Sequence, residues 1–255
     1  MASKTPVVRF LKRIGLISPD SISVGPGSGL HFDPGPSNPN YASGDNELPV
    51  QHMLVEHLQA GSVFYDVGAN VGFLTVLGAR LVGPQGMVYA FEPVPTNAAC
   101  VRQNVAANRF TQVEVIEKAV SNISGTGELN LAKYSGGAAL DLASVDAPPD
   151  ADGKLQVDIA TIDDLVNHSG LRPPDLVKID VEGAEFEVLE GMAATTKRYR
   201  PVVIVEFDAA SASTLQRKQT AGVEWLSRRG YRVQELPDSY PGAGWLVKHI
   251  IATPV

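Results

Sequence analysis

Short apolar runs alternate with segments of helical periodicity from residue 47 to the end of the chain. Each apolar run has the usual length of a β-strand, and most are followed by apolar positions that recur as on one face of a helix. Val202 to Val205 is apolar without interruption, as expected for a strand covered on both faces. The five runs that we interpret as parallel strands are 63–66, 87–92, 113–116, 176–180 and 202–206.

Helices are expected between these strands and after the last of them. Thr161 is a candidate N-cap for a short helix, because two acidic residues follow it in the first turn. Two further strands are expected at 231–236 and 245–252. The pattern predicts a doubly wound α/β fold, a mostly parallel sheet of about seven strands with helices on both faces. The other helical segments are 50–58, 71–82, 97–108, 184–196 and about 213–229.

Two regions break the alternation. Residues 1–45 are rich in glycine and proline, and we interpret them as a flexible or loosely packed arm in preference to a lid over a binding site. A later section is dense in turn residues, and two of its segments, 127–131 and 155–159, alternate in polarity like edge strands. The sequence therefore predicts an N-terminal arm and one main domain over 46–255, with a small β insertion within 122–160.

Composition and charge limit the class of protein. The chain has 255 residues, of which 44% are hydrophobic, so it can bury one substantial core. The formal net charge is -7 and no extended basic cluster is present, so nucleic acid is not an expected partner. No window holds the ~18 apolar residues of a membrane span, and the N-terminus lacks the apolar core of a signal peptide. We expect a soluble, cytoplasmic protein. Cys100 is the only cysteine, which rules out an intramolecular disulfide.

Acidic residues end four of the five expected parallel strands. The carboxyl ends of parallel strands meet at one edge of a sheet, and folds of this type bind ligands just outside that edge. The sequence therefore predicts an acidic ligand-binding edge. The four residues are Asp66, Glu92, Asp180 and Glu206.

A glycine turn follows the first strand. The segment from Asp66 to Gly72 joins the apolar run before it to a helical segment, and it contains Gly68 as well as Gly72. Such a turn presents backbone N–H groups and the positive end of a helix to a ligand. Glu92 ends the next strand about 20 residues beyond the glycines, where an acidic residue usually binds ribose hydroxyls. We therefore expect a ligand that contains a nucleoside.

The spacing of the glycines distinguishes between nucleoside cofactors. A dinucleotide-binding turn has the pattern Gly-x-Gly-x-x-Gly, whereas here three residues separate Gly68 from Gly72. Asp66 would repel a pyrophosphate, but its carboxylate could accept hydrogen bonds from an ammonium group. S-adenosylmethionine carries an ammonium group and no phosphate, so it is the expected cofactor. A nicotinamide cofactor is the alternative.

A second group of acidic residues follows the fourth strand. Alternation along this strand places Lys178 and Asp180 on the same side, and Glu182 follows in a turn. An alcohol attacks a methyl donor well only when a base removes its proton, and Asp180 and Glu182 are our candidates for that base. For Lys178 and Glu185, a structural role is as well supported as a role in the site. Lys178 could pair with a neighbouring acid, and Glu185 could balance the dipole of the next helix.

A metal site is a less favoured alternative. Asp180, Glu206 and Asp208 could supply oxygen ligands to magnesium, which would lower the pKa of an acceptor hydroxyl. Carboxylates often gather at strand ends without a metal, so our preferred prediction has no metal. The five histidines have no zinc-helix spacing, and structural roles are their default interpretation.

Several of these segments resemble the FkbM family of S-adenosylmethionine-dependent methyltransferases. They occur in the family's order and cover roughly residues 60 to 210. The resemblance implies the class I methyltransferase fold, which is Rossmann-like, and, in most described members, O-methylation of sugars or natural-product hydroxyls. It does not reach the arm, the stretch 134–153 or the last 45 residues, where acceptor specificity is expected. The matching segments are Phe64 to Gly72, Ala90 to Asn97, Lys118 to Ser121, Thr161 to Leu165 and Lys178 to Glu185.

The resemblance also implies roles for individual residues. Cofactor contacts are implied at Asp66, Gly68, Asn70, Gly72, Glu92, Pro93, Asn97, Lys118, Ala119 and Asp180. The first three surround the methionine part of the cofactor, Glu92 binds the ribose hydroxyls, and the segment from Lys118 lies near the adenine. Asp180 and Glu182 would lie beside the transferred methyl group, with Glu206 close by.

The favoured function is S-adenosylmethionine-dependent O-methylation of a saccharide or secondary-metabolite hydroxyl, by direct in-line transfer with a carboxylate base. The partner would then be a small-molecule or glycan acceptor. One alternative is a catalytically inactive nucleoside-binding protein of the same fold, and another is an NAD(P)-dependent oxidoreductase. The sequence leaves the acceptor, the choice between O- and N-methylation and the oligomeric state open.

Overall fold

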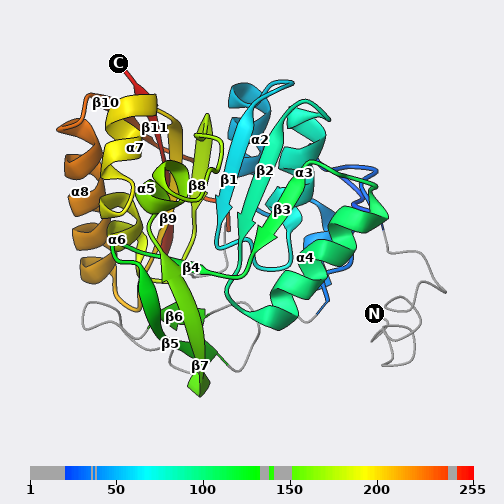
Figure 1. Ribbon diagram of the computed structural model, residues 1–255, viewed down its shortest axis with the longest axis horizontal. Coiled ribbons are helices and arrows are strands. Elements are labelled where there is room, and N and C mark those ends of the chain that lie inside the picture. The colour runs from blue at the N-terminus through cyan, green and yellow to red at the C-terminus, as the bar shows by residue number, and fades with distance from the viewer. Residues whose placement is uncertain (1–20, 36, 38, 133–137, 141–150, 241–245) are drawn as a thin grey trace.

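A seven-stranded sheet forms the centre of the molecule in the computed structural model, which describes residues 21–35, 37, 39–132, 138–140, 151–240 and 246–255 (Figure 1). The strand order is β10-β11-β9-β8-β1-β2-β3. Within this sheet β1, β2, β3, β8 and β9 run parallel, whereas β11 pairs antiparallel with β9 and β10. The predicted mostly parallel sheet is confirmed. The strands are β1 (Val63–Val67), β2 (Met87–Phe91), β3 (Val113–Ile116), β8 (Leu176–Ile179), β9 (Val202–Asp208), β10 (Tyr231–Glu235) and β11 (Val247–Pro254).

Helices cover both faces of this sheet, and each face has its own hydrophobic core. Successive β1 side chains alternate between the cores, since Phe64 lies in one and Tyr65 in the other. The first core is completed by α2 (Leu48–His57), α3 (Phe73–Val82) and α4 (Pro95–Ala107). The second is completed by α5 (Ile162–Asn167), α6 (Glu185–Glu190), α7 (Ala193–Tyr199) and α8 (Ala212–Ser227). No helix among the described residues is long and apolar enough to cross a bilayer.

The single helix expected over 184–196 is wrong, because the structure divides it into α6 and α7. The division falls at Gly191, where an added Cβ would lie 2.0 Å from the carbonyl oxygen of Ser121. The Asp163 carboxylate accepts hydrogen bonds from the Ala194 and Thr195 N–H groups at 2.9 and 2.7 Å and so caps the new helix. A tertiary contact and a distant cap therefore start α7. Thr161 accepts a hydrogen bond from Asp164 N–H, as its predicted role as N-cap of α5 requires.

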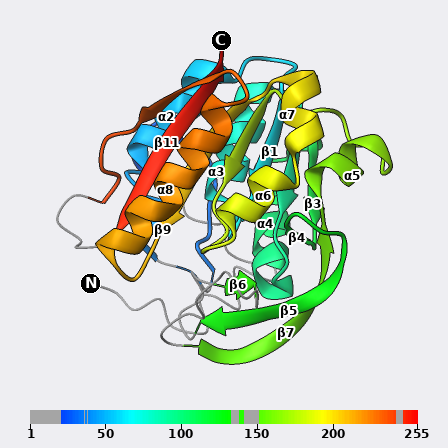
Figure 2. The same cartoon turned by 90° about the vertical axis from the view of Figure 1, so that its left-hand side faces the viewer.

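A second, smaller sheet has the order β4-β7-β5-β6. Its strands are β4 (Ala119–Val120), β5 (Gly125–Ala132), β6 (Ala138–Leu140) and β7 (Ala151–Ala160), which confirms the predicted β insertion; residues 133–137 and 141–150 lie outside the described part of the chain. Because β4 begins three residues after the end of β3, this sheet starts at the carboxyl edge of the main sheet. Figures 1 and 2 show it below the main sheet, where it extends the molecule beyond that edge.

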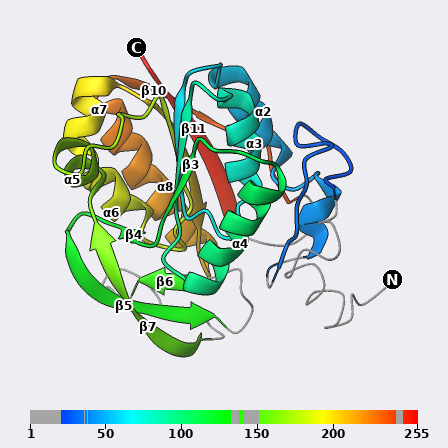
Figure 3. The ribbon, with the colours of Figure 1, turned by 45° about the vertical axis from the view of Figure 1, so that its right-hand side comes forward.

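The described part of the N-terminal arm, residues 21–45 without 36 and 38, packs against the main domain beside α3 and α4 (Figure 3). It includes the short helix η1 (Pro39–Ser43). Phe32 is fully buried, and its ring contacts that of Phe73 edge to face at 5.5 Å. Asn104 exchanges hydrogen bonds with the backbone of Asp33, and Asn108 does so with that of His31. The expectation of a loosely packed arm is therefore wrong for these residues, since buried aromatic surface and paired amides hold them.

Candidate active site

The glycine turn lies against the ends of β2 and β8. The N–H groups of Gly68 and Ala69 both donate to the carbonyl oxygen of Phe91 at 3.0 Å. Gly68 has a φ of 83°, and an added Cβ there would lie 1.6 Å from the carbonyl oxygen of Asp180. Only glycine fits such an approach. The turn ends at Gly72, the N-cap of α3, so the start of that helix faces the same edge of the sheet.

Glu92 connects the glycine turn to the turn after β2. One carboxylate oxygen accepts a hydrogen bond from Asn70 N–H at 2.8 Å, and the other accepts one from Val94 N–H at 2.9 Å. The side chain is buried, and this burial raises the pKa of Glu92 to about 7. A carboxylate has about four lone-pair positions, so both oxygens can still accept hydrogen bonds from a ligand.

Two amide oxygens near Glu92 are unsatisfied. Within the part of the chain that the structure describes, Asn70 Oδ1 and Asn97 Oδ1 are buried and have no hydrogen-bond partner. Buried polar atoms are nearly always paired in folded proteins, so unpaired ones at the carboxyl edge indicate a place for polar groups of a ligand. Pro93, which follows Glu92 in the chain, is half-buried. These residues therefore fit a nucleoside cofactor.

Asp66 is buried in β1 and faces α3, where its carboxylate accepts a hydrogen bond from the Thr75 hydroxyl at 2.6 Å. Burial raises the pKa of Asp66, and the charge of Lys178 and the hydrogen bond from Thr75 act in the opposite direction. Asp66 therefore has a structural partner in addition to the cofactor role that the sequence suggested.

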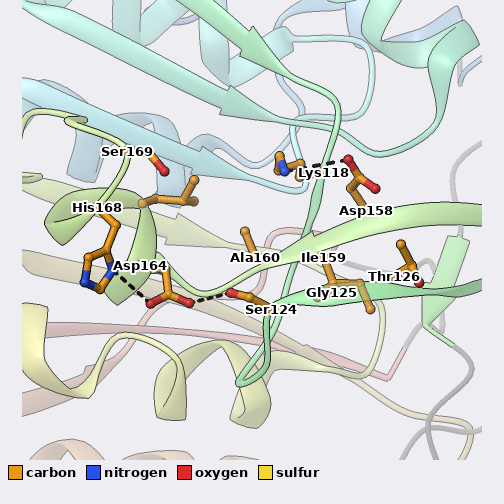
Figure 4. A pocket seen from close by; sticks show the side chains of 11 residues that line it. Lys118, Ser124, Gly125, Thr126, Asp158, Ile159, Ala160, Asp164, His168 and Ser169 are labelled. Atoms are coloured by element: carbon orange, nitrogen blue, oxygen red, sulfur yellow. Dashed lines mark hydrogen bonds and ion pairs between the residues drawn. The ribbon is translucent and has the colours of Figure 1, made fainter.

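Lys118 extends toward the smaller sheet. Its ammonium group lies 3.7 Å from the Asp158 carboxylate, and both residues line a pocket of about 450 Å³ between β7, β5 and α5 (Figure 4). Ser124 and His168 line the same pocket and both contact the Asp164 carboxylate. The lining residues include none of the glycine turn. Ala119, the neighbour of Lys118, is buried at the start of β4.

Lys178 and Asp180 face the same side of β8, as predicted. The Lys178 ammonium donates to Asp180 at 2.6 Å and lies 4.0 Å from a carboxylate oxygen of Glu47. Burial works against a charged lysine, but Asp180 and Glu47 outweigh it and raise the pKa of Lys178. Asp180 remains 25% exposed, so this carboxylate is accessible from the edge of the sheet. The pairing of Lys178 with an acidic neighbour is therefore observed.

Glu182 and Glu185 follow in the turn and at the start of α6. Glu182 has a φ of 52°, and burial, followed by the charges of Asp180 and Asp208, raises its pKa. Glu185 is buried and accepts a hydrogen bond from Gly183 N–H. Burial raises the pKa of Glu185 to about 8, against the opposing charge of Lys218 at 3.7 Å. Both carboxyl groups therefore retain protons more strongly than exposed ones.

Glu206, on β9, is buried next to His249 on β11. Burial, together with Asp180 and Glu47, raises the pKa of Glu206, and burial lowers that of His249. The magnesium candidates named from the sequence were Asp180, Glu206 and Asp208. Among the described residues, the group whose ligand atoms all lie within 4.8 Å of one another is instead Glu47, Glu206 and His249.

Sequence reasoning missed Glu47 and His249 because neither belongs to a motif. Glu47 precedes α2 with a φ of 49°, and this turn brings it to the carboxyl edge. His249 stands opposite Glu206 only because β11 pairs antiparallel with β9 in a particular register. Both placements depend on tertiary structure.

Comparison with known proteins gives concordant results. The sequence profile described as the methyltransferase FkbM domain matches residues 66–233. The 31-O-demethyl-FK506 methyltransferase FkbM of Streptomyces tacrolimicus is 30% identical over 181 residues, which cover 61% of this chain and 69% of the relative. The hexuronic acid methyltransferase AglP of Haloferax volcanii is 27% identical over 163 residues, covering 64% of this chain and 63% of AglP. The chain thus spans about two thirds of each relative.

The fold is shared more widely. An rRNA methylase from Streptococcus thermophilus has a TM-score of 0.52 and 12% sequence identity, over 82% of this chain and 95% of the methylase. This level of identity supports the shared fold alone. The sequence match, in contrast, begins at Asp66 and includes Gly68, Glu92 and Asp180, the residues that the structure gathers at the carboxyl edge. By its sequence, the chain belongs to the FkbM family of methyltransferases.

Proposed function

We propose that this protein transfers a methyl group from S-adenosylmethionine to a hydroxyl group of a saccharide or secondary metabolite. The observation that carries the cofactor assignment is Glu92, a buried carboxylate fixed by two backbone N–H groups beside two unsatisfied amide oxygens. Ribose hydroxyls would donate to the free lone pairs of Glu92. Gly68 lies so close to the backbone of Asp180 that no side chain fits there, so the turn would present bare backbone to the cofactor.

The acceptor assignment draws on the names of the relatives. AglP is a hexuronic acid methyltransferase, and NoeI of Sinorhizobium fredii, 28% identical over 167 residues covering 61% of this chain and 68% of NoeI, is a 2-O-methyltransferase. Hydroxyl groups are weak nucleophiles until deprotonated, so an enzyme for them needs a base. The carboxylates at the end of β8 provide candidates for it.

When bound, S-adenosylmethionine supplies an electrophilic methyl group on a positively charged sulfur. The chain's own residues have to orient the acceptor in line and accept its proton. Asp180 is already paired with Lys178 at 2.6 Å, so it is suited to holding the acceptor hydroxyl by hydrogen bonding. Glu182 is the candidate base, because it follows Asp180 in the same turn, and burial and acidic neighbours raise its pKa so that its ionised form is a stronger proton acceptor.

Calorimetric titration with S-adenosylhomocysteine and, separately, NADH tests the cofactor assignment. We expect micromolar binding of S-adenosylhomocysteine, at least tenfold weaker in Glu92→Ala, and no binding of NADH. Binding of NADH in place of S-adenosylhomocysteine would favour an oxidoreductase and overturn the proposal.

Turnover with a panel of sugars and hydroxylated metabolites tests the chemistry. Glu182→Gln should lower kcat by roughly 10²- to 10⁴-fold, as for loss of a general base, and leave S-adenosylhomocysteine binding unchanged. Glu56→Gln, which alters an exposed carboxylate on α2, is the control. If the protein binds the cofactor but neither methylates any acceptor nor hydrolyses the methyl donor, the result would support the alternative of an inactive nucleoside-binding protein.

A further inference from the structure

Three buried side chains from separate parts of the chain converge behind Lys178. Glu47 comes from the turn before α2, Glu206 from β9 and His249 from β11, and one ligand atom of each lies within 4.8 Å of the others. Their exposed fractions are 4%, 8% and 2%. His249 and Glu206 are direct cross-strand neighbours in the β9–β11 pair, so backbone hydrogen bonding fixes two of the three positions.

The atoms that face one another are unsatisfied. Among the described residues, Glu47 Oε2, Glu206 Oε2 and His249 Nε2 are buried and have no hydrogen-bond partner. His249 Nε2 and Glu206 Oε2 lie 2.5 Å apart, an ion-pair contact if the imidazole is protonated, but no hydrogen bond joins them. The nearest cation to Glu47 Oε2 is the Lys178 ammonium, 4.0 Å away and already bonded to Asp180. Three buried polar atoms that face one another without a hydrogen bond indicate a place for a common partner.

The opposite atoms of two of these side chains are anchored. His249 Nδ1 lies 3.2 Å from the Ser239 hydroxyl, and Glu47 Oε1 accepts a hydrogen bond from the Asn46 amide at 2.9 Å. Side chains that bind metals are commonly held in this way, with one atom oriented by a neighbour and the other directed at the ion. The anchoring leaves Nε2 of His249 and Oε2 of Glu47 directed at the cluster.

The charge of the region also favours a cation. Four carboxylates, those of Asp180, Glu47, Glu206 and Asp66, act on the ammonium of Lys178. Carboxylates thus outnumber this ammonium in a buried region, which is costly without a further counter-charge or a bound proton. A divalent cation would supply that counter-charge.

We propose that Glu47, Glu206 and His249 bind a first-row divalent transition metal ion of the manganese-to-zinc series. One imidazole nitrogen and two carboxylate oxygens suit these ions, whereas magnesium prefers oxygen ligands alone. The site shares Glu206 with the magnesium set expected from the sequence, but its other ligands and its metal differ. None of the three proposed ligands belongs to the glycine turn. Metal binding should therefore not require the methyl donor or the acceptor, and it can be measured in their absence.

Cobalt(II) absorption spectroscopy tests this directly, on untagged full-length protein stripped of metal with a chelator. We expect visible d–d bands that saturate at one cobalt per chain, disappear when zinc is added and persist in excess magnesium. His249→Gln and Glu47→Gln should each weaken cobalt binding by 10- to 100-fold or more. Two exposed residues of α2 provide the controls, His52→Gln and Glu56→Gln, which should bind as the wild type does.

The cobalt test uses both His249→Gln and Glu47→Gln, so that it still gives a result if one of these variants folds poorly. Circular dichroism will show whether each variant is folded. Glu47→Gln keeps the size of the side chain and lies outside the sheet, so it tests the site if His249→Gln disturbs β11. Absence of saturable cobalt binding to the wild type would overturn the proposal, and Glu206 and His249 would then share a proton instead. Cobalt binding that survives in both folded variants would overturn it as well.

Discussion

At the scale of single residues, Glu92 links protonation to ligand binding. Its carboxyl group is buried, with a pKa of about 7 in place of the ordinary 4.5, and a ligand that donates hydrogen bonds to it favours the ionised form. Binding therefore has to release the proton that the free protein holds at Glu92 below pH 7.

The affinity for S-adenosylhomocysteine should accordingly rise roughly tenfold between pH 6 and pH 8 and level off above that. Calorimetry in buffers of different ionisation enthalpy will measure both the affinity and the proton release. In Glu92→Gln the pH dependence should disappear along with most of the affinity. A wild-type affinity that is constant over this range would contradict the prediction.

The same raised pKa affects the stability of the ligand-free protein. The folded state binds a proton at Glu92 up to about pH 7, whereas the unfolded chain loses it near 4.5. The contribution of Glu92 to stability is thus greatest below pH 4.5 and decreases as the pH rises to about 7. Cofactor binding offsets this loss at neutral pH.

Gly68 has the tightest backbone approach at the site. Gly68→Ala would place a Cβ 1.6 Å from the Asp180 carbonyl oxygen, so β1 and β8 would have to separate. We expect a loss of more than about 3 kcal/mol in the free energy of unfolding and no detectable cofactor binding. Urea denaturation and calorimetry will measure the two effects.

Gly29→Ala is a matched control for this substitution. Gly29 has a φ of 84°, almost that of Gly68, but an added Cβ would meet nothing within 4 Å. Gly29→Ala should therefore lower the free energy of unfolding only by the cost of backbone strain, about 1 kcal/mol. Equal losses in the two variants would mean that the close approach to Asp180 contributes nothing.

At the scale of elements, the break between α6 and α7 explains one of the family's sequence motifs. Asp163 accepts hydrogen bonds from the backbone of Ala194 and Thr195 and from the Thr195 hydroxyl, so it caps a helix 30 residues further along the chain. The segment Thr161 to Leu165 therefore has a structural role in joining α5 to α7.

Asp163→Ala should lower the free energy of unfolding by about 1–2 kcal/mol and leave S-adenosylhomocysteine affinity unchanged, because only the cap is lost. Asp163→Asn should recover most of that stability, since asparagine is an equally good capping residue. Chemical denaturation followed by circular dichroism will compare the three proteins. A loss of cofactor affinity in Asp163→Ala alone would assign this motif to the binding site.

At the scale of the whole molecule, the described part of the N-terminal arm belongs to the same core as α3. Phe32→Ala should reduce the free energy of unfolding by about 3–5 kcal/mol, because it removes a fully buried ring that packs against Phe73. Urea denaturation will measure it. Val24→Ala, at a side chain that is 52% exposed, should change it by less than about 0.5 kcal/mol. A loss below about 1 kcal/mol in Phe32→Ala would mean that the arm is ordered independently.

The formal net charge of -7 makes nucleic acid an unexpected partner for this protein. We expect no binding to a labelled structured RNA in fluorescence anisotropy at ~50 mM salt, because a net negative charge and a sequence without an extended basic cluster give little to displace counterions from phosphates. Binding that weakens steeply with added salt would contradict this expectation.

The sequence by itself determined the fold class and the glycine turn after β1. Apolar runs, helical periodicity and glycine spacing are local properties, and the chain order of strands then places Asp66, Glu92 and Asp180 at one edge. Only the tertiary structure decided what depends on contacts between distant segments. Gly191 separates α6 from α7 because the backbone of Ser121 packs against it. Phe32 holds the arm in place because its ring is buried against Phe73 of α3. Glu47 reaches Glu206 and His249 only once α2 and the antiparallel β11 are packed, since no local pattern encodes strand register or the position of a turn.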